Sequence, residues 1–459
     1  MEMMSLREAS AAIGARATGH DVRFSAVSTD SRTLERGALF VALRGERFDG
    51  HQFLSTVKAR GAAAAMVDEA SKAETASLPL LVVRDTRLGL GQLAAHWRAR
   101  FDIPLIAVTG SNGKTTVKEM IAAILRSHFG EARVLATEGN LNNDIGLPLT
   151  LLKLRAEHRA AVIELGMNHP GETASLAAIA SPTIALVNNA QREHQEFMRS
   201  VAEVALEHAA VFAGLRQGGV AVVNADDEFA AYWRGLLTGK IVRDFGVDRP
   251  AQVSARFTPS SFGNRIELRS PEGEIAVELR ASGRHNVSNA CAAAASALAA
   301  GASLEAVARG LAGFRPVGGR MQRLTARSGA SLIDDSYNAN PDSVRAAIDV
   351  LAAEAGMRFL LLGDMGEVGE RGAEFHREIG RYARERGVDR LYATGELCRA
   401  AVEAFGKGAR HFPAVEALVA AARDEVVSNT AALVKGSRFM RMERVVQALA
   451  ADPKKAGTH

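Results

Sequence analysis

Apolar residues in the middle of the chain come in short, continuous runs that alternate with amphipathic stretches. The run IPLIAVTG at 103–110 has the length of a strand and ends in glycine, a pattern typical of a parallel strand buried on both faces. The next stretch places apolar residues on one helical face, at Val117, Met120, Ile121, Ile124 and Leu125. Further runs of the first kind, RAAVIELG, TIALVNN and GVAVVNAD, are interleaved with helical patterns. This repetition predicts a doubly wound α/β domain with a parallel sheet.

Two other blocks flank this region. Residues 1–101 mix short strand-and-turn units, FSAVSTDSR and GALFVALRG, with a helical stretch at 88–100. Residues 316–459 contain four strand-like runs, ASLIDDSY, RFLLLGDM, DRLYATG and AALVKGS, which indicate a second, smaller Rossmann-like sheet. We therefore expect an α/β protein of three domains, at 1–101, 102–315 and 316–459. The tail from 452 to 459 is expected to fray.

Near the end of the central block, continuous apolar runs give way to alternation. QVSARFTP, RIELRS and EIAVELR alternate roughly between apolar and polar residues, and Pro271-Glu272-Gly273 is a turn signal between the last two. We expect antiparallel strands that extend the parallel sheet. The segment GRHNVSNACAAAASALAAG then begins a helix, with Asn and Ser as candidate caps.

Length and composition agree with this organisation and exclude several classes of protein. The 459 residues fit about three domains, and 47% hydrophobic with 24% charged residues is ordinary for a soluble protein. No apolar stretch reaches the about 20 residues of a membrane span, and MEMMSLREAS lacks the pattern of a signal peptide. Two cysteines, Cys291 and Cys398, exclude a disulfide scaffold and favour a reducing cytoplasm. A net charge of +4 is too small for a nucleic-acid-binding surface.

The strongest chemical signal follows the first central strand. There the chain reads Gly110-Ser111-Asn112-Gly113-Lys114-Thr115-Thr116, between a predicted strand and a predicted helix. This context is typical of a loop that binds nucleotide phosphates, because backbone N–H groups and the helix N-terminus face the anion. Lys114 would reach the β- and γ-phosphates, and the Thr115 hydroxyl would hold Mg²⁺. The loop is two residues shorter than the common GxxxxGK[ST] form.

Two residues at the ends of the next strands are candidate metal ligands. Glu164 ends the strand in VIELG, and a carboxylate at this edge of a parallel sheet, beside the phosphate loop, is well placed for Mg²⁺. His194 follows TIALVNN. Imidazole is an unusual ligand for a cation that prefers oxygen, so chemistry alone favours Glu164 over His194.

Other polar clusters are less specific. GRHNVSNA offers two asparagines that could pair with adenine or simply cap a helix. DDSYNANP is either a binding segment or an Asx-rich turn, and KGSR offers two cations that suit a carboxylate. STDSR also fits plain turn chemistry. The residues concerned are Ser31, Arg32, Asn286, Asn289, Asp335, Asn338, Lys435 and Arg438.

Taken together and in this order, several motifs resemble those of the Mur ligases of peptidoglycan synthesis. They are TGSNGKTT, TEGNLNNDIGLP, IELGMNHPGE, GRHNVSNA, DDSYNANPDS, GDMGEVG and LVKGSR. The N-terminal STDSR…GALFVALRGERFDGHQF also resembles the nucleotide-sugar domain of that family, so the resemblance covers nearly the whole chain. The central motifs are shared with folylpolyglutamate synthase. DDSYNANP, LNNDIG and KGSR are more specific to the member that adds D-alanyl-D-alanine.

The resemblance implies an N-terminal substrate domain, a central domain similar to P-loop ATPases and a C-terminal Rossmann-like ligase domain. It implies a cytoplasmic enzyme, here expected to be a monomer, that uses ATP and Mg²⁺. Its substrates would be D-alanyl-D-alanine and UDP-N-acetylmuramoyl-tripeptide, whose third residue is diaminopimelate or lysine. The tripeptide carboxylate would attack the γ-phosphate to give an acyl phosphate and ADP, and the dipeptide amine would then displace phosphate.

The resemblance also implies roles for individual residues. Lys114, Glu164 and His194 would be catalytic, with Thr115, Glu164 and His194 around the metal. The nucleotide would contact the phosphate loop from Gly110 to Thr116, and its adenosine part would contact Asn286, Asn289 and Asp335. The expected substrate-binding residues are Ser31, Arg32, Asn142, Asn143, Asn338, Lys435 and Arg438.

One position departs from the family pattern. Many Mur ligases carry a carbamylated lysine about a dozen residues past the histidine, which acts as a carboxylate for a second metal. Here VAEVALEHAAVF places His208 at that position, beside Glu207, and neither side chain can be carbamylated. Either neutral His208 binds the metal, or Glu207 turns in, or water holds the second metal more weakly. We expect activity that does not depend on bicarbonate.

Two other classes of function compete with this ligase. The first is the same chemistry on another substrate, as in another Mur ligase or a folate-type ligase. The second is a non-ligase P-loop protein such as a nucleotide-dependent switch, although the guanine-binding N-K-x-D motif is absent. The three-block layout also predicts motion about a hinge near 314–316. Without nucleotide, we expect Asp335 and Lys435 to stand apart from the phosphate loop.

Overall fold

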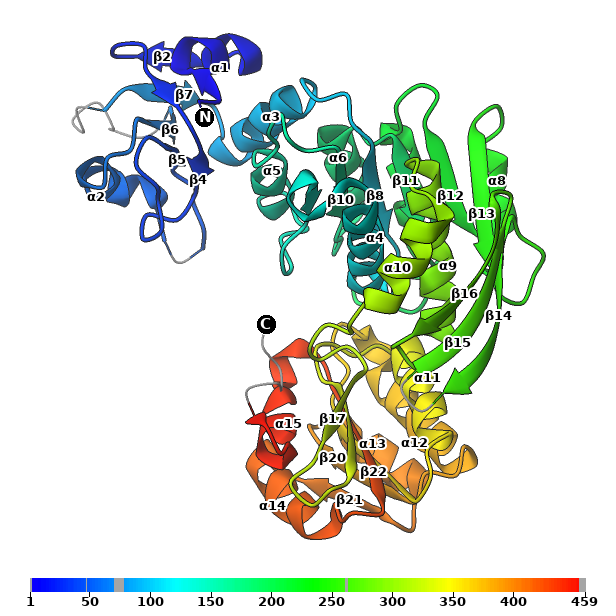
Figure 1. Cartoon of the computed structure of the whole chain (residues 1–459). Coiled ribbons are helices and arrows are strands. Elements are labelled where there is room, and N and C mark those ends of the chain that lie inside the picture. The colour runs from blue at the N-terminus through cyan, green and yellow to red at the C-terminus, as the bar shows by residue number, and fades with distance from the viewer. Residues whose placement is uncertain (1, 47, 70–77, 261–262, 454–459) are drawn as a thin grey trace.

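The structure, a computed structural model, describes residues 2–46, 48–69, 78–260 and 263–453. Three α/β domains follow one another along the chain, each built on its own sheet, and the central domain lies between the other two (Figure 1). The expected fold class is confirmed. Residues 454–459 of the tail expected to fray lie outside the described ranges. Among the described helices, none combines the length and the apolar character needed to cross a bilayer.

The N-terminal domain has a mixed five-stranded sheet in the order β2-β7-β6-β5-β4, beside a small β1-β3 pair. Its strands are β1 (Met4–Ser5), β2 (Arg16–Thr18), β3 (Arg23–Phe24), β4 (Val27–Ser28), β5 (Leu39–Val41), β6 (Ala64–Asp68) and β7 (Leu80–Val83). Its helices are α1 (Leu6–Ile13), η1 (Gly50–Phe53), α2 (Leu54–Ala59) and α3 (Thr86–Arg98). Helix α3, expected at 88–100, is capped by the Asp85 side chain. It packs against α5 and α6 of the central domain and so joins the two domains.

The central domain contains a nine-stranded sheet covered by helices on both faces. Its strands are β8 (Leu105–Thr109), β9 (Val134–Ala136), β10 (Ala160–Glu164), β11 (Ile184–Val187), β12 (Val220–Asn224), β13 (Ile241–Gly246), β14 (Val253–Ser260), β15 (Gly263–Ser270) and β16 (Gly273–Leu279). Its helices are α4 (Lys114–Phe129), η3 (Glu131–Arg133), α5 (Gly146–Leu151), α6 (Glu172–Ala180), α7 (Val201–Ala209), η4 (Ala210–Gly214), α8 (Ala230–Leu236), α9 (Arg284–Ala299) and α10 (Leu304–Gly313).

The order of the central strands creates a binding crevice beside β8. The sheet runs β16-β15-β14-β13-β12-β11-β8-β10-β9, parallel from β9 to β14 and antiparallel at β15 and β16. The expected parallel sheet and its antiparallel extension are therefore both present. Strand β8 has β10 on one side and β11 on the other, and ligands of doubly wound sheets bind where the order reverses in this way. All five apolar residues expected on one face of α4 are buried.

The C-terminal domain has a six-stranded sheet in the order β17-β18-β22-β19-β20-β21, with β17 antiparallel to β18 and the rest parallel. Its strands are β17 (Gln322–Thr325), β18 (Ser331–Asp335), β19 (Met357–Gly363), β20 (Arg390–Thr394), β21 (Ala409–Phe412) and β22 (Thr430–Lys435). Its helices are α11 (Pro341–Ala352), η5 (Gly369–Arg371), α12 (Gly372–Glu385), α13 (Cys398–Phe405), α14 (Val415–Glu425), η6 (Arg438–Met440) and α15 (Glu443–Leu449). The four expected strands are the inner ones. The sequence pattern missed β17 and β21 because these edge strands are only partly buried and carry no continuous apolar run.

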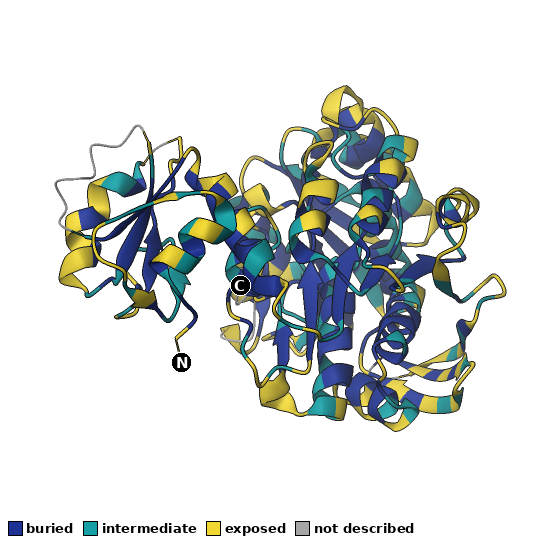
Figure 2. Cartoon of the chain, turned by 90° about the horizontal axis from the view of Figure 1, so that it is seen from above, coloured by how far each residue is buried: buried dark blue, intermediate teal, exposed yellow. Residues whose placement is uncertain are grey.

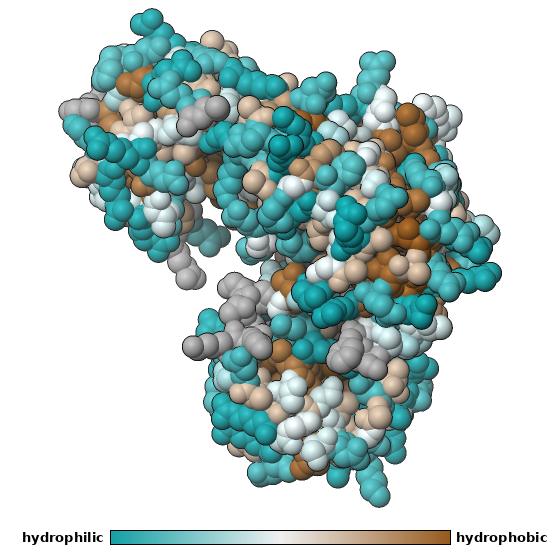
Figure 3. All heavy atoms as spheres, viewed as in Figure 1, coloured by the Kyte–Doolittle hydropathy of each residue, from teal (hydrophilic) through white to brown (hydrophobic). Residues whose placement is uncertain are grey.

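Burial follows this layering. The inner strands of the sheets are buried, the strands near the sheet edges such as β14 and β16 carry exposed residues, and the helices turn exposed faces outward (Figure 2). Hydrophilic side chains cover most of the N-terminal and C-terminal domains on the face shown in Figure 3, and the molecule is hollowed between these domains. The core therefore holds each sheet rigid, while the loops at the carboxyl ends of the strands stay free to carry functional groups.

Candidate active site

A cavity of about 2100 Å³ lies between the central and C-terminal domains. Its wall contains most of the residues expected to be functional: Ser111, Asn112, Gly113, Lys114, Thr115, Thr116, Asn142, Asn143, Glu164, His194, Asn286, Asn289, Asp335, Asn338, Lys435 and Arg438. Four expected residues, Ser31, Arg32, Gly110 and His208, are not part of this wall. Strands β8, β10 and β11 end at the same edge, which brings the phosphate loop, Glu164 and His194 together.

The phosphate loop joins β8 to α4 and depends on two glycines. Gly110 and Gly113 have φ of 133° and 83°, in the region that favours glycine. A Cβ on Gly113 would lie 2.5 Å from Asn289 Oδ1, and one on Gly110 would lie 3.0 Å from the backbone nitrogen of Asn189. The loop therefore packs tightly on neighbouring segments and presents its backbone at the N-terminus of α4, as a phosphate site requires.

Lys114 folds back onto its own loop. Its Nζ donates to the carbonyl oxygens of Gly110, at 2.6 Å, and Ser111, at 3.3 Å, and lies 3.5 Å from Glu193 Oε2. Two carbonyls and one carboxylate thus surround the ammonium. A phosphate would offer stronger, charge-assisted partners at the same place.

Glu164 presents an unpartnered oxygen in this cavity. The residue is 2% exposed, and its Oε1 accepts a hydrogen bond from Asn142 Nδ2 at 2.8 Å. Its Oε2 is buried and has no hydrogen-bond partner among the residues that the structure describes. A buried carboxylate oxygen without a partner destabilises the fold unless a cation or a hydrogen-bond donor binds it. Glu164 and the nearby Thr115 hydroxyl therefore fit a divalent cation that prefers oxygen ligands.

His194 lies at the contact with the C-terminal domain. Its backbone φ of 48° is left-handed, which is uncommon for a residue other than glycine. Nδ1 lies 2.6 Å from Glu367 Oε2, and Nε2 lies 3.7 Å from Glu193 Oε2. Nδ1 makes no hydrogen bond among the described residues, and its close approach holds the pKa of the Glu367 carboxyl below its usual range.

His208 stands behind the phosphate loop, and both of its ring nitrogens are engaged. Nδ1 lies 2.9 Å from Thr109 Oγ1, and Nε2 lies 2.8 Å from Glu193 Oε1. A carboxylate only accepts, so Nε2 donates to Glu193 and Nδ1 accepts from the Thr109 hydroxyl. This geometry does not support the expected role of His208 as a metal ligand. His208 instead orients Glu193.

Glu207 does not turn toward the cavity either. Its carboxylate accepts hydrogen bonds from the backbone N–H groups of Gly171 and Thr173, both at 2.8 Å. These groups lie at the N-terminus of α6, where a negative charge is favoured. Of the three alternatives for the second metal, the two that use a side chain at 207 or 208 find no support in these contacts.

Glu193 is a functional candidate that sequence reasoning missed. It is buried, it lines the cavity, and it faces Lys114, His194 and His208. Burial alone would raise its pKa, but the nearby Lys114 charge and the His208 hydrogen bond outweigh burial and lower the pKa to about 2. The carboxylate is therefore a fixed negative charge. The sequence indicated a functional segment here through the adjacent His194, but only the fold shows that the Glu193 side chain points toward the phosphate loop.

Asparagine amides connect the phosphate loop to α9. Asn188 Nδ2 donates to Asn112 O at 2.8 Å and to Asn289 Oδ1 at 3.0 Å, and Asn289 Nδ2 donates to Asn286 Oδ1 at 3.1 Å. Asn286 and Asn289 thus line the cavity but pair with protein atoms. Asn143 Oδ1 accepts a hydrogen bond from the backbone nitrogen of Gly146, the first residue of α5, at 2.9 Å.

The C-terminal domain contributes an acid and a lysine that neutralise each other. Lys435 Nζ lies 2.5 Å from Asp335 Oδ2 and 2.9 Å from the carbonyl oxygen of Asn338, and the lysine side chain is 3% exposed. The structure therefore does not support Lys435 as a ligand for a substrate carboxylate. Arg438 differs, because its guanidinium stacks on Tyr337 at 5.3 Å in the cavity wall, where it can meet an anion.

Ser31 and Arg32 lie in the N-terminal domain, just after β4. The Arg32 guanidinium hydrogen-bonds to Asp30 at 2.8 Å and 2.9 Å, and a hydrogen bond from Arg32 lowers the pKa of Asp30 to about 2. The Arg32 side chain is 84% exposed. The pair is open to solvent and separate from the cavity at the phosphate loop.

The central and C-terminal domains touch directly at the phosphate loop. Asn112 and Asn340 exchange amide hydrogen bonds, and the Arg192 guanidinium binds both Asp342 and Glu378. Asp335 and Lys435 line the same cavity as Lys114. These groups therefore surround one cavity in this structure, because polar contacts on loop 188–197 hold the domains together. That they stand apart without nucleotide stays a prediction.

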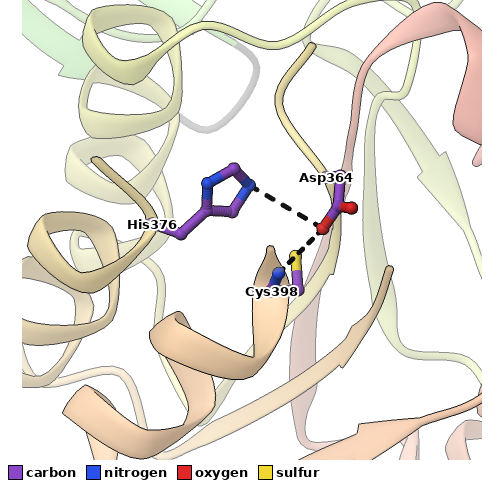
Figure 4. A group of neighbouring side chains, drawn as sticks. All are labelled: Asp364, His376 and Cys398. Atoms are coloured by element: carbon purple, nitrogen blue, oxygen red, sulfur yellow. Dashed lines mark hydrogen bonds and ion pairs between the residues drawn. The ribbon is translucent and has the colours of Figure 1, made fainter. Parts of the chain in front are cut away.

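A second group of ligand-type side chains, Asp364, His376 and Cys398, is buried in the C-terminal domain (Figure 4). Its polar atoms are already satisfied. Asp364 accepts from the backbone nitrogens of Leu397 and Cys398, and His376 Nε2 accepts from Met365 N at 3.0 Å. His376 Nδ1 lies 2.7 Å from the carbonyl oxygen of Gly372. This group anchors the loop after β19 and leaves no free ligand atom for a metal.

Three family models match the chain. They are the Mur ligase family catalytic domain over residues 23–98, the Mur ligase middle domain over 108–297, and the Mur ligase glutamate ligase domain over 319–438. UDP-N-acetylmuramoyl-tripeptide–D-alanyl-D-alanine ligase of Escherichia coli strain K12 is 43% identical over 441 residues, which cover 94% of this chain and 95% of the relative. The ligase of the same name from Bacillus subtilis strain 168 is 33% identical over 435 residues, 93% of each chain.

Solved structures of ligases of the same family are also similar to this chain. A crystal structure of MurF from Acinetobacter baumannii superposes with a TM-score of 0.90 and 34% identity, covering 97% of this chain and 98% of that one. MurF ligase from Thermotoga maritima in complex with ADP superposes with a TM-score of 0.80 and 25% identity, covering 94% and 98%. The similarity thus extends over all three domains.

Proposed function

This chain belongs to the Mur ligase family, and we propose that it joins D-alanyl-D-alanine to UDP-N-acetylmuramoyl-tripeptide as ATP is cleaved to ADP and phosphate. Relatives named for this reaction match nearly the whole chain, at up to 43% identity. The enzyme is thus an ATP-dependent ligase that forms an amide bond in peptidoglycan synthesis. We infer that it acts as a monomer in the cytoplasm.

One observation supports the nucleotide chemistry more than any other. The buried, unpartnered Oε2 of Glu164 lies in the wall of the same cavity as Lys114 and the N-terminus of α4. This arrangement combines a cation ligand with two positive groups that suit phosphates. Mg²⁺ held by Thr115, Glu164 and His194 would neutralise phosphate charge.

In the first step, the tripeptide carboxylate attacks the γ-phosphorus of ATP. The new O–P bond gives an acyl phosphate, and the bond to the β-phosphate oxygen breaks to release ADP. The nucleophile is already ionised, so this step needs no general base. It does need charge neutralisation, because an anion approaches a polyanion. Lys114 supplies it by exchanging its carbonyl partners for phosphate oxygens.

In the second step, the neutral amine of D-alanyl-D-alanine attacks the acyl carbon. The C–N bond forms, the C–O bond to phosphate breaks, and the nitrogen loses a proton. We assign Arg438 to the dipeptide carboxylate, because its guanidinium lies in the cavity wall and pairs with no carboxylate of the described residues. Asn142 orients Glu164 from the loop beside the reacting phosphate.

The N-terminal domain is assigned to the nucleotide-sugar part of the substrate, through Ser31 and Arg32. The exposed Arg32 guanidinium suits a diphosphate, and α3 connects this domain rigidly to the central one. Asn286, Asn289 and Asp335 are assigned to the adenosine side. The hydrogen-bonded amides from Asn286 through Asn289 to Asn188 then hold α9 at a fixed place relative to the phosphate loop.

An ADP-release assay tests this function. The complete mixture holds the purified chain, ATP, Mg²⁺, UDP-N-acetylmuramoyl-tripeptide and D-alanyl-D-alanine, and each substrate is omitted in turn. Sustained ADP release only with both substrates supports the ligase. Release with a single amino acid or a folate in place of the dipeptide would point to a different ligase, and release without any acceptor would point to a nucleotide switch.

A further inference from the structure

We propose that Glu367 of the C-terminal domain is a positioning residue for His194, so that docking of this domain completes the cation site of the central domain. The inference rests on the proposed role of His194 as a metal ligand. Glu367 lies in the GDMGEVG motif, to which the reaction described above assigns no part.

The contact joins two loops from different domains. Glu367 Oε2 lies 2.6 Å from His194 Nδ1, and the backbone N–H of Glu196 donates to the carbonyl oxygen of Glu367 at 3.2 Å. A Cβ on Gly369 would lie 3.2 Å from the carbonyl oxygen of Gln195, so the absence of a side chain there permits the approach. The contact thus involves both backbone and side chains.

Both partners have an unusual backbone conformation. His194 has φ of 48° and Glu367 has φ of 57°, and the described ranges contain five non-glycine residues with positive φ. Such conformations are strained by about 1 kcal/mol or more and concentrate at functional sites. Two of the five face each other across one domain boundary. The strain is consistent with loops shaped to bring these two side chains together.

The loop that carries Glu367 is anchored at the three residues just before it. Asp364 and His376 hold its start through the hydrogen bonds shown in part in Figure 4, and Gly366 N donates to Ser437 Oγ at 2.6 Å. The rest of the domain thus positions the loop, so Glu367 moves with the domain. When the C-terminal domain moves away, the carboxylate leaves His194.

The contact with Glu367 determines which nitrogen of His194 can face a cation. Glu367 lies against the Nδ1 side of the ring, which leaves Nε2, the nitrogen on the side of Glu193, as the one that can face a cation. The same contact fixes the orientation of the imidazole ring, and a histidine held in one orientation binds a cation more tightly than one that must be ordered on binding. Cation binding and domain docking then favour each other to the same extent.

The test measures cation binding directly. Free Mn²⁺ is quantified by electron paramagnetic resonance with the full-length chain and the non-hydrolysable analogue AMP-PCP. Glu367→Ala and Glu367→Gly should each weaken Mn²⁺ binding by about 10-fold. The glycine variant removes the carboxylate without adding strain at a positive φ. Glu367→Gln keeps a neutral acceptor and should lose less. The control is Glu370→Gln, which changes an exposed carboxylate in η5 and should bind like the unmodified chain.

Two results would overturn the inference. One is Mn²⁺ binding by the alanine and glycine variants within about twofold of the unmodified chain. The other is an equal loss in the alanine and glutamine variants together with an expanded small-angle scattering profile, because Glu367 would then only hold the domains together. An unmodified chain that binds Mn²⁺ as expected but ligates nothing would refute the proposed function and leave this inference standing.

Discussion

Asn112 of the phosphate loop and Asn340 at the N-terminus of α11 exchange two amide hydrogen bonds, of 2.9 Å and 3.2 Å. Asn340 also caps α11 by accepting from Ser343 N at 2.8 Å. The first turn of a C-terminal helix therefore sits directly on the loop that is expected to bind ATP phosphates. Nucleotide binding and the position of the C-terminal domain cannot be independent in such an arrangement.

The first prediction concerns the ionic contact that supports this docking. Arg192→Ala removes a guanidinium that binds Asp342 and Glu378 across the domain boundary. Leaving two carboxylates unpaired should weaken docking by about 2–5 kcal/mol. We expect a larger radius of gyration in small-angle scattering and slower ligation. Arg234→Ala, which breaks the Asp244 pair within the central domain, is the control and should change neither. Equal scattering profiles for the two variants would contradict the prediction.

The second prediction concerns the phosphate loop. Lys114→Ala should lower the rate of ADP release by about 100- to 1000-fold, the usual cost of removing one preorganised charge partner of a reacting group. The fold should persist, because the carbonyls that Lys114 contacts belong to its own loop. Lys153→Ala, at an exposed lysine paired with Glu138, serves as the control. An undiminished rate in the Lys114 variant would refute the phosphate-loop mechanism.

The third prediction concerns bicarbonate. His208 and Glu207 occupy the segment where other family members carry a carbamylated lysine, and both are engaged by protein partners. Glu193 already supplies a permanent carboxylate at the cavity. Ligation should therefore proceed at the same rate in carbonate-free buffer and with added bicarbonate, and intact-mass spectrometry should find no carbamate. A carbamate adduct, or activation by bicarbonate, would show that a lysine takes this role after all.

The fourth prediction separates two cations of the KGSR motif. Lys435→Ala leaves the carboxylate of Asp335 without its buried partner, so urea denaturation should show a loss of about 3 kcal/mol in the free energy of unfolding. Arg438→Ala should change the free energy of unfolding little, because the side chain is exposed and loses only its stacking on Tyr337, worth about 0.5–1 kcal/mol at an exposed site. It should instead raise the KM for D-alanyl-D-alanine. The reverse pattern, with Lys435 controlling KM and Arg438 controlling stability, would contradict both assignments.

Local sequence was sufficient for the parts of this protein that depend on near neighbours. Continuous apolar runs predicted β8, β10, β11 and β12 and the inner strands of the C-terminal sheet. Helical spacing predicted the buried face of α4, and the glycine–lysine motif located the phosphate loop. Glu164 could be placed in the cavity because the carboxyl ends of parallel strands meet at one edge. These inferences succeed because period, strand length and turn geometry are short-range properties of the chain.

The partners of charged side chains depended on the folded chain. Lys435 looked like a free cation in the sequence, but residues about a hundred positions away neutralise it, and His208 proved to support Glu193. The roles of four residues became visible only at the boundary between two domains: Glu193, Arg192, Asn340 and Glu367. A charge acts on whatever lies within a few ångströms in space, and no periodicity in the sequence records which distant residues those are.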